Sequence, residues 1–130
     1  MKVSVIQMCA GYDKAKNLLK AEQMIQEAIE KGAQFVLLPE LFNQRVVDST
    51  PLDAEPITGD SITLLRRLAK RYRRWILAGS FCEKSADISK TYNTSVLIND
   101  TEAVAATYRK LHLFDVRVQD RSILESKIGR

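Results

Sequence analysis

The sequence predicts a single α/β domain with the element order βαβαβββ. Strand-like segments rich in Val, Ile and Leu alternate with two amphipathic segments of helical period. The second strand-like segment is apolar almost throughout, which is typical of a strand covered on both faces of a parallel sheet. The length of 130 residues suits one domain. Together these observations favour a layered α/β fold whose first three strands run parallel.

The first two strands flank a helix with recognisable ends. The first strand is predicted at residues 2–8, KVSVIQM. Asp13 is a suitable N-cap for a helix at residues 17–31, because the apolar side chains there fall on one face and Gly32 follows as the C-terminal stop. The second strand is predicted at residues 34–38.

The remaining elements follow a loop. Residues 43–58 contain two prolines and are predicted to form that loop. A second helix is expected to start at Asp60 or Ser61 and to end near Arg74. Three further strands are predicted at residues 75–81, 92–98 and 104–111. The polar turn at residues 99–102 predicts that the last two of these strands form a hairpin.

The net charge of +4 and the pI near 9.2 do not point to nucleic acid. Much of the basic excess surrounds an apolar stripe in the second helix, where it is typical of a solvated face. These basic residues are Arg66, Arg67, Lys70, Arg71, Arg73 and Arg74. No apolar run approaches the roughly 18 residues that span a bilayer. The N-terminus enters a strand without a signal-peptide pattern. We therefore predict a cytoplasmic protein with neither a nucleic-acid nor a membrane partner.

The two cysteines, Cys9 and Cys82, form no CxxC pair and have no histidine cluster beside them. Metal-binding and disulfide frameworks therefore lack support. Each cysteine is predicted to be a small buried apolar residue at the end of a strand.

Glu40 is the first candidate site residue. It follows the apolar run FVLLP at residues 35–39, and more apolar residues come next. A glutamate there is either the first solvated residue of a loop or a carboxylate held at a strand end for chemistry. Ligands of open α/β sheets bind outside the carboxyl ends of the strands, which favours the second interpretation. Phe42 and Asn43 could line a substrate entrance or could cap the strand end.

Lys110 is the second candidate. It follows the last predicted strand and has Leu111 and Leu113 beside it. Such a lysine is either a solvated cation or the partner of a carboxylate, in which case it could also stabilise an oxyanion. We predict that the Glu40 carboxylate and the Lys110 ammonium lie within salt-bridging distance at the carboxyl end of the sheet.

Several segments, taken in order along the whole chain, resemble the nitrilase superfamily of carbon–nitrogen hydrolases. They are VSVIQM, FVLLPELFN, AEPITGDS, WILAGSFCEK, TYNTSVLIND and YRKLHLFDV. The AEPITG segment, the YNT strand and the LHLFDV…ES ending are most similar to the ω-amidase-like branch. The resemblance implies the N-terminal part of a four-layer α-β-β-α sandwich, a fold that usually dimerises. It implies no metal and no organic cofactor.

The resemblance also implies roles for individual residues. Glu40 matches the family's general base and Lys110 its oxyanion-stabilising lysine, while Phe42, Asn43 and Tyr92 are candidate substrate-binding residues. Family members hydrolyse small non-peptide amides or nitriles through a Glu-Lys-Cys triad whose thiolate attacks the carbonyl carbon.

The family's nucleophile cysteine lies downstream of the lysine motif. Residues 1–130 are therefore expected to be a partial domain, truncated before that cysteine. Two hypotheses remain open: an ω-amidase-like hydrolase that carries only Glu and Lys of the triad here, and a non-catalytic remnant or binding subunit. Self-association is expected because one sheet face would lack its cover.

Overall fold

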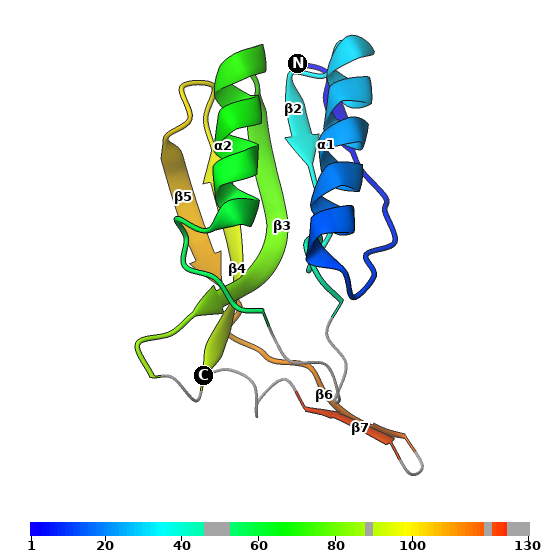
Figure 1. The fold of residues 1–130 in the computed structure, drawn as a ribbon, viewed down its shortest axis with the longest axis vertical. Helices are drawn as coiled ribbons and strands as arrows, with labels where there is room; N and C mark the ends of the chain where they lie inside the picture. The colour runs from blue at the N-terminus through cyan, green and yellow to red at the C-terminus, as the bar shows by residue number, and fades with distance from the viewer. Residues whose placement is uncertain (46–52, 88–89, 119–120, 125–130) are drawn as a thin grey trace.

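The computed structural model describes residues 1–45, 53–87, 90–118 and 121–124 (Figure 1). Side chains are described as far as residue 114. Two helices and seven strands are present in these ranges. They are β1 (Val3–Val5), α1 (Lys14–Glu30), β2 (Phe35–Leu37), α2 (Asp60–Tyr72), β3 (Trp75–Lys84), β4 (Thr91–Ile98), β5 (Val104–Arg109), β6 (Asp115–Val118) and β7 (Arg121–Leu124).

The first five strands form one sheet in the order β1-β2-β3-β4-β5. The pairs β1–β2 and β2–β3 are parallel, whereas β3–β4 and β4–β5 are antiparallel. The predicted α/β class and the order βαβαβββ are therefore confirmed, as is the hairpin of the last two predicted strands. The structure adds a separate two-stranded hairpin, β6–β7, where the sequence analysis predicted no strand.

Specific residues cap the ends of the two helices. The Asp13 side chain accepts a hydrogen bond from the backbone N–H of Lys16 and so caps α1, as predicted. Gly32 follows α1 with φ of 89°, a conformation that glycine adopts without strain. Gly59 is the N-cap of α2 and has no side chain to offer, so Glu55 accepts from the backbone N–H of Ser61 instead. Neither α1 nor α2 is long and apolar enough to cross a membrane, and these are the helices of the described residues.

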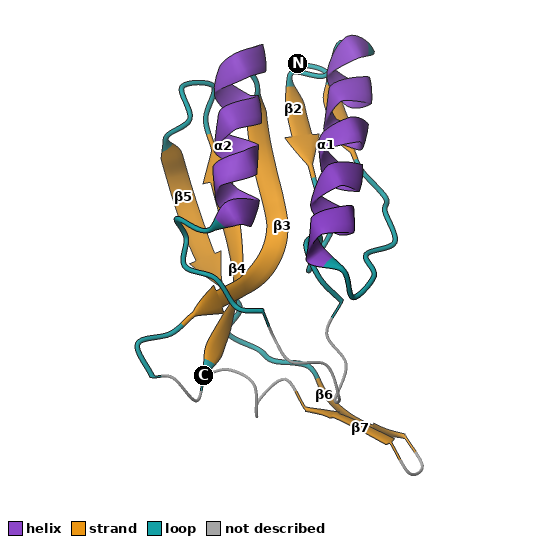
Figure 2. Ribbon diagram, viewed as in Figure 1, coloured by secondary structure: helices purple, strands orange, loops and turns teal. Residues whose placement is uncertain are grey.

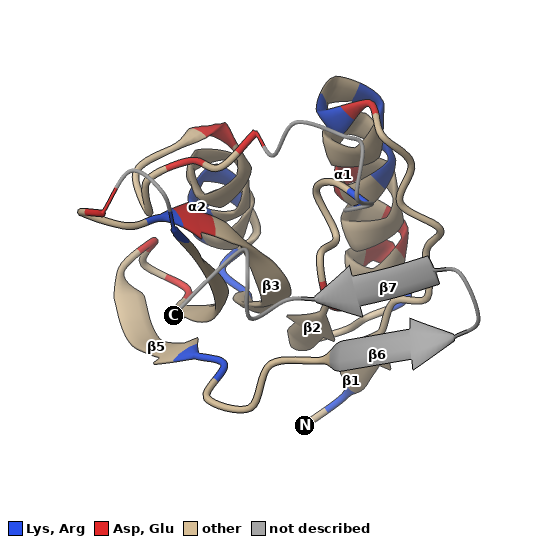
Figure 3. Ribbon diagram, turned by 90° about the horizontal axis from the view of Figure 1, so that it is seen from below, with Lys and Arg blue, Asp and Glu red and all other residues tan. Residues whose placement is uncertain are grey.

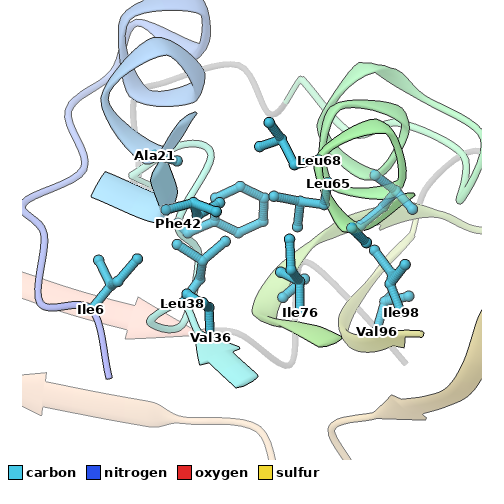
Figure 4. Packing of buried hydrophobic residues seen from close by; sticks show 14 of the residues in the cluster. Ile6, Ala21, Val36, Leu38, Phe42, Leu65, Leu68, Ile76, Val96 and Ile98 are labelled. Carbon is cyan, nitrogen blue, oxygen red and sulfur yellow. The ribbon is translucent and has the colours of Figure 1, made fainter. Parts of the chain in front are cut away.

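The two helices lie side by side on one face of the five-stranded sheet (Figures 2 and 3). The hydrophobic core fills the space between these layers. Alternate strand residues such as Val36, Ile76 and Val96 point into it and are fully buried. Phe42 comes from the segment after β2 and lies between the two layers, among core side chains of α1 and α2 (Figure 4).

The other face of the sheet carries apolar side chains that remain in contact with solvent. Successive residues of a strand point to opposite faces of the sheet, so the residues next to the core residues in sequence have their side chains on this face. Val3, Val5, Trp75 and Tyr108 are 47%, 77%, 40% and 59% exposed. These side chains lie on β1, β3 and β5 of the same sheet, which makes this face a candidate contact surface.

Candidate active site

Glu40 follows β2 and Lys110 follows β5, and these two strands point towards the same edge of the sheet (Figure 1). Lys110 Nζ lies 3.1 Å from Glu40 Oε1, so the two side chains form the predicted ion pair across 70 residues of sequence. The Glu40 side chain is 57% exposed and that of Lys110 is 29% exposed. A substrate could therefore reach the carboxylate from solvent.

Asn93 of β4 completes this cluster. Its Nδ2 donates to Glu40 Oε1 at 2.9 Å, and its backbone carbonyl accepts from the backbone N–H of Lys110 at 2.9 Å. Oε1 of Glu40 therefore accepts two hydrogen bonds. Among the described residues, no group donates to Oε2, which is left to accept a proton from another molecule or segment.

A second cluster lies on the opposite face of the same strands. Arg109 donates from Nε and Nη2 to the two carboxylate oxygens of Glu83, each at 2.9 Å, and Thr94 Oγ1 donates to Glu83 Oε2 at 2.7 Å. The Arg109 guanidinium also stacks 4.3 Å above the Tyr92 ring centroid. The hydrogen bonds from Arg109 hold the pKa of Glu83 below its usual value, although burial opposes this effect.

Strand alternation explains why the two clusters separate. Thr94 pairs with Arg109 in the antiparallel register, so both side chains point to one face. Their sequence neighbours, Lys110 after Arg109 and Asn93 before Thr94, point to the other face. Both of these side chains donate to Glu40 Oε1. Tyr92 shares the face of Arg109, and its hydroxyl accepts from Ser85 Oγ at 3.2 Å. Asn93, rather than the predicted Tyr92, is therefore the β4 residue that contacts Glu40.

The segment after Glu40 is anchored by buried side chains. Phe42 is fully buried in the core. Asn43 is 1% exposed, and its Nδ2 donates to Glu55 Oε1 at 3.1 Å and to Ser61 Oγ at 3.0 Å. For Phe42 and Asn43 the structure favours the role of fixing the strand end over that of lining an entrance. Substrate contact by Phe42, Asn43 and Tyr92 stays a prediction.

The two cysteines differ in environment. Cys9 is exposed, so the prediction that it is buried is wrong: β1 ends at Val5, and the backbone has left the sheet before residue 9. Cys82 is buried as predicted and is the register partner of Asn93 across β3 and β4. Cys82 therefore points to the same face of the sheet as the Glu40 cluster. No group of three or more potential metal ligands occurs among the described residues.

Residues 2–130 match the family model named carbon-nitrogen hydrolase. This chain belongs to the carbon–nitrogen hydrolase family. It is 38% identical over 118 residues to an omega-amidase of Xenopus laevis, NIT2-A, and this match covers 90% of the chain and 42% of the relative. It is 35% identical over 121 residues to the deaminated glutathione amidase of Bos taurus, a match that covers 89% of the chain and 37% of the relative.

The fold agrees with this assignment. The crystal structure of the Caenorhabditis elegans NitFhit protein superposes with a TM-score of 0.84 at 28% identity, covering 98% of this chain and 32% of that one. The chain thus spans about two fifths of the length of the curated relatives it matches. The predicted resemblance to the nitrilase superfamily and its ω-amidase-like members is confirmed.

Proposed function

We propose that this chain supplies the general base, Glu40, and the oxyanion-stabilising cation, Lys110, of an ω-amidase-like hydrolase of small non-peptide amides. The observation that carries the proposal is the 3.1 Å contact between Lys110 Nζ and Glu40 Oε1 at the carboxyl edge of the sheet. Family membership and the two amidase relatives support the reaction class. The thiolate nucleophile comes from polypeptide beyond these 130 residues, in the same chain or in another.

In the first half-reaction, Oε2 of Glu40 takes the proton of the cysteine thiol, because Oε1 is occupied by Asn93 and Lys110. The thiolate sulfur then bonds to the amide carbonyl carbon, and the carbonyl oxygen becomes an oxyanion beside the Lys110 ammonium. When the carbon–nitrogen bond breaks, the nitrogen takes the proton from Glu40 and leaves as ammonia. An acyl thioester remains.

In the second half-reaction, a water molecule gives a proton to Glu40 and attacks the thioester carbon. Lys110 again faces the developing oxyanion. The carbon–sulfur bond breaks, the sulfur recovers the proton from Glu40, and a carboxylic acid leaves. The same carboxylate therefore serves as base and then as acid in each half-reaction, which requires its free oxygen to stay accessible.

The proposal is tested by completing the chain. A fusion would join residues 1–130 to the part of the Xenopus laevis omega-amidase that lies beyond the matched residues, and ammonia release from ω-amides of small dicarboxylic acids would be measured. We expect turnover by the fusion, and a loss of about 10²–10⁴-fold in kcat for Glu40→Gln because the general base is removed. Lys110→Met should cost about 10²–10³-fold through loss of oxyanion stabilisation.

An exposed ion pair at the C-terminal end of α1 provides the matched control. Lys31 Nζ forms an ion pair with Glu27 Oε1, and the side chain of Lys31 is 70% exposed and that of Glu27 62% exposed. The variants Glu27→Gln and Lys31→Met should leave turnover unchanged. A folded fusion that keeps its turnover after Glu40→Gln would overturn the proposal, as would one that releases no ammonia from any of these amides.

A further inference from the structure

The backbone that carries Glu40 bends sharply at the end of β2. Leu41, the residue after Glu40, has φ of 49°, in the left-handed region that a bulky side chain rarely adopts. Such a conformation persists only when the surrounding structure holds it in place. The contacts that hold Leu41 therefore also fix the direction in which Glu40 leaves the sheet.

Those contacts come from an irregularity in β3. The register between β3 and β4 shifts between Ala78 and Phe81, so β3 contains one extra residue at this point. Gly79 lies in the irregular stretch, and a Cβ on it would come within 2.1 Å of the Leu38 carbonyl oxygen and 2.5 Å of Pro39 backbone atoms. The backbone of β3 thus packs directly against the backbone that leads into Glu40.

Ser80, the next residue of the irregular stretch, accepts hydrogen bonds from the backbone of the bend after Glu40. Its Oγ accepts from the backbone N–H of Leu41 at 2.9 Å, and its carbonyl oxygen accepts from the backbone N–H of Phe42 at 3.3 Å. The residue is 3% exposed. One serine therefore accepts from both N–H groups that follow Glu40. Ser95 of β4 donates to the Gly79 carbonyl oxygen and holds the irregular stretch from its other side.

We propose that Ser80 is a positioning residue for the Glu40 carboxylate: its hydroxyl holds Leu41 in the left-handed conformation and so aims Glu40 at Asn93 and Lys110. The catalytic meaning of this role rests on the proposed function. The placement of Glu40 does not rest on that function, because it can be measured in residues 1–130 alone, without any catalytic turnover.

The side-chain amide of Asn93 is the reporter, since its Nδ2 donates to Glu40 Oε1 at 2.9 Å. In a ¹H–¹⁵N spectrum of the ¹⁵N-labelled chain, its signals are assigned by their loss in Asn93→Ser. Glu40→Gln then defines their position when no carboxylate accepts the bond. We expect Ser80→Ala to move the Asn93 signals more than midway towards that position. Ser80→Thr, which keeps a hydroxyl, should return them towards the wild-type position.

Ile98→Val separates positioning from general loosening. Ile98 is fully buried at the end of β4 that lies opposite to Asn93, away from the Leu41 bend. This variant should lower the urea midpoint while leaving the Asn93 signals in place. Wild-type Asn93 signals in folded Ser80→Ala would overturn the proposal, and so would equal movement in Ile98→Val. If Ser80→Ala does not fold, Ser80→Cys, with its weaker acceptor, gives the same comparison.

The effect of Ser80 on catalysis can be measured in the completed fusion. Ser80→Ala should lower kcat and leave KM nearly unchanged, because the base is misaligned while substrate contacts remain. A fusion without activity would count against the proposed function but would leave the Asn93 result intact. The two failures are therefore distinguishable.

Discussion

Gly79 offers the sharpest test of how closely β3 packs against the segment that leads into Glu40. A Cβ at this position would lie 2.1 Å from the Leu38 carbonyl oxygen and 2.5 Å from the Pro39 carbonyl carbon and oxygen. Real Cβ atoms essentially never approach a heavy atom closer than 3.0 Å, so the two backbones must separate by at least 0.9 Å. All of the nearest atoms are backbone, which cannot turn away as a flexible side chain could.

The expected cost of Gly79→Ala follows from this separation. Overpacking typically costs about 1–3 kcal/mol. The Leu38 N–H bond to the Leu77 carbonyl, 2.9 Å long, and the Leu41 N–H bond to Ser80 Oγ are stretched as well, at about 1 kcal/mol each. We expect the free energy of unfolding to fall by about 3–5 kcal/mol, a large share of the roughly 5–15 kcal/mol of a typical domain.

Urea unfolding followed by far-ultraviolet circular dichroism measures this change. With a slope of about 1–3 kcal/mol/M, the midpoint should fall by roughly 1–5 M. Gly11→Ala is the matched control, because a Cβ there would meet only Asn17 Oδ1, at an ordinary 3.9 Å. That variant should be neutral or more stable by about 0.4–1 kcal/mol. Equal midpoints for the two variants would refute the packing argument.

Three further predictions concern pH, association and catalysis. The pKa of Glu83 is held low by Arg109, so its stabilisation is present above its usual value of 4.5 and is lost as the pH falls through the folded pKa. The urea midpoints of wild type and Glu83→Gln should therefore converge as the pH falls below 4.5, and a pH-independent gap would contradict this. The exposed apolar sheet face should make the chain self-associate at micromolar concentration, and light scattering that shows a stable monomer would count against it. The chain alone should release no ammonia from ω-amides above the buffer rate. Turnover that is lost in both Cys82→Ala and Glu40→Gln would instead identify Cys82 as the nucleophile.

Most of the fold could be predicted because local signals agree with it. Asp13 and Gly32 mark the ends of α1, and the unbroken apolar run of residues 35–38 marks a central strand. The β6–β7 hairpin was not predicted, although residues 115–124, DVRVQDRSIL, begin with alternating apolar and polar residues that favour a strand. That pattern could have revealed the hairpin.

The site was predictable in part. Glu40 and Lys110 each follow a strand, and strands that end at one edge of a sheet bring such residues together. The contribution of Asn93 depends on which face of β4 it occupies, and that is set by the register with β5. The role of Ser80 depends on one extra residue in β3, whose position no local pattern in the sequence reveals.

The central claim is that Glu40 and Lys110 act as one catalytic unit. The most direct test is kcat for ammonia release by the completed fusion in four forms: unsubstituted, Glu40→Gln, Lys110→Met and the double variant. If the two side chains work as a unit, removing the second costs little once the first is gone, and the double variant should lie within about tenfold of the slower single variant. A double variant slowed by the full product of the two single effects would show independent roles and contradict the claim.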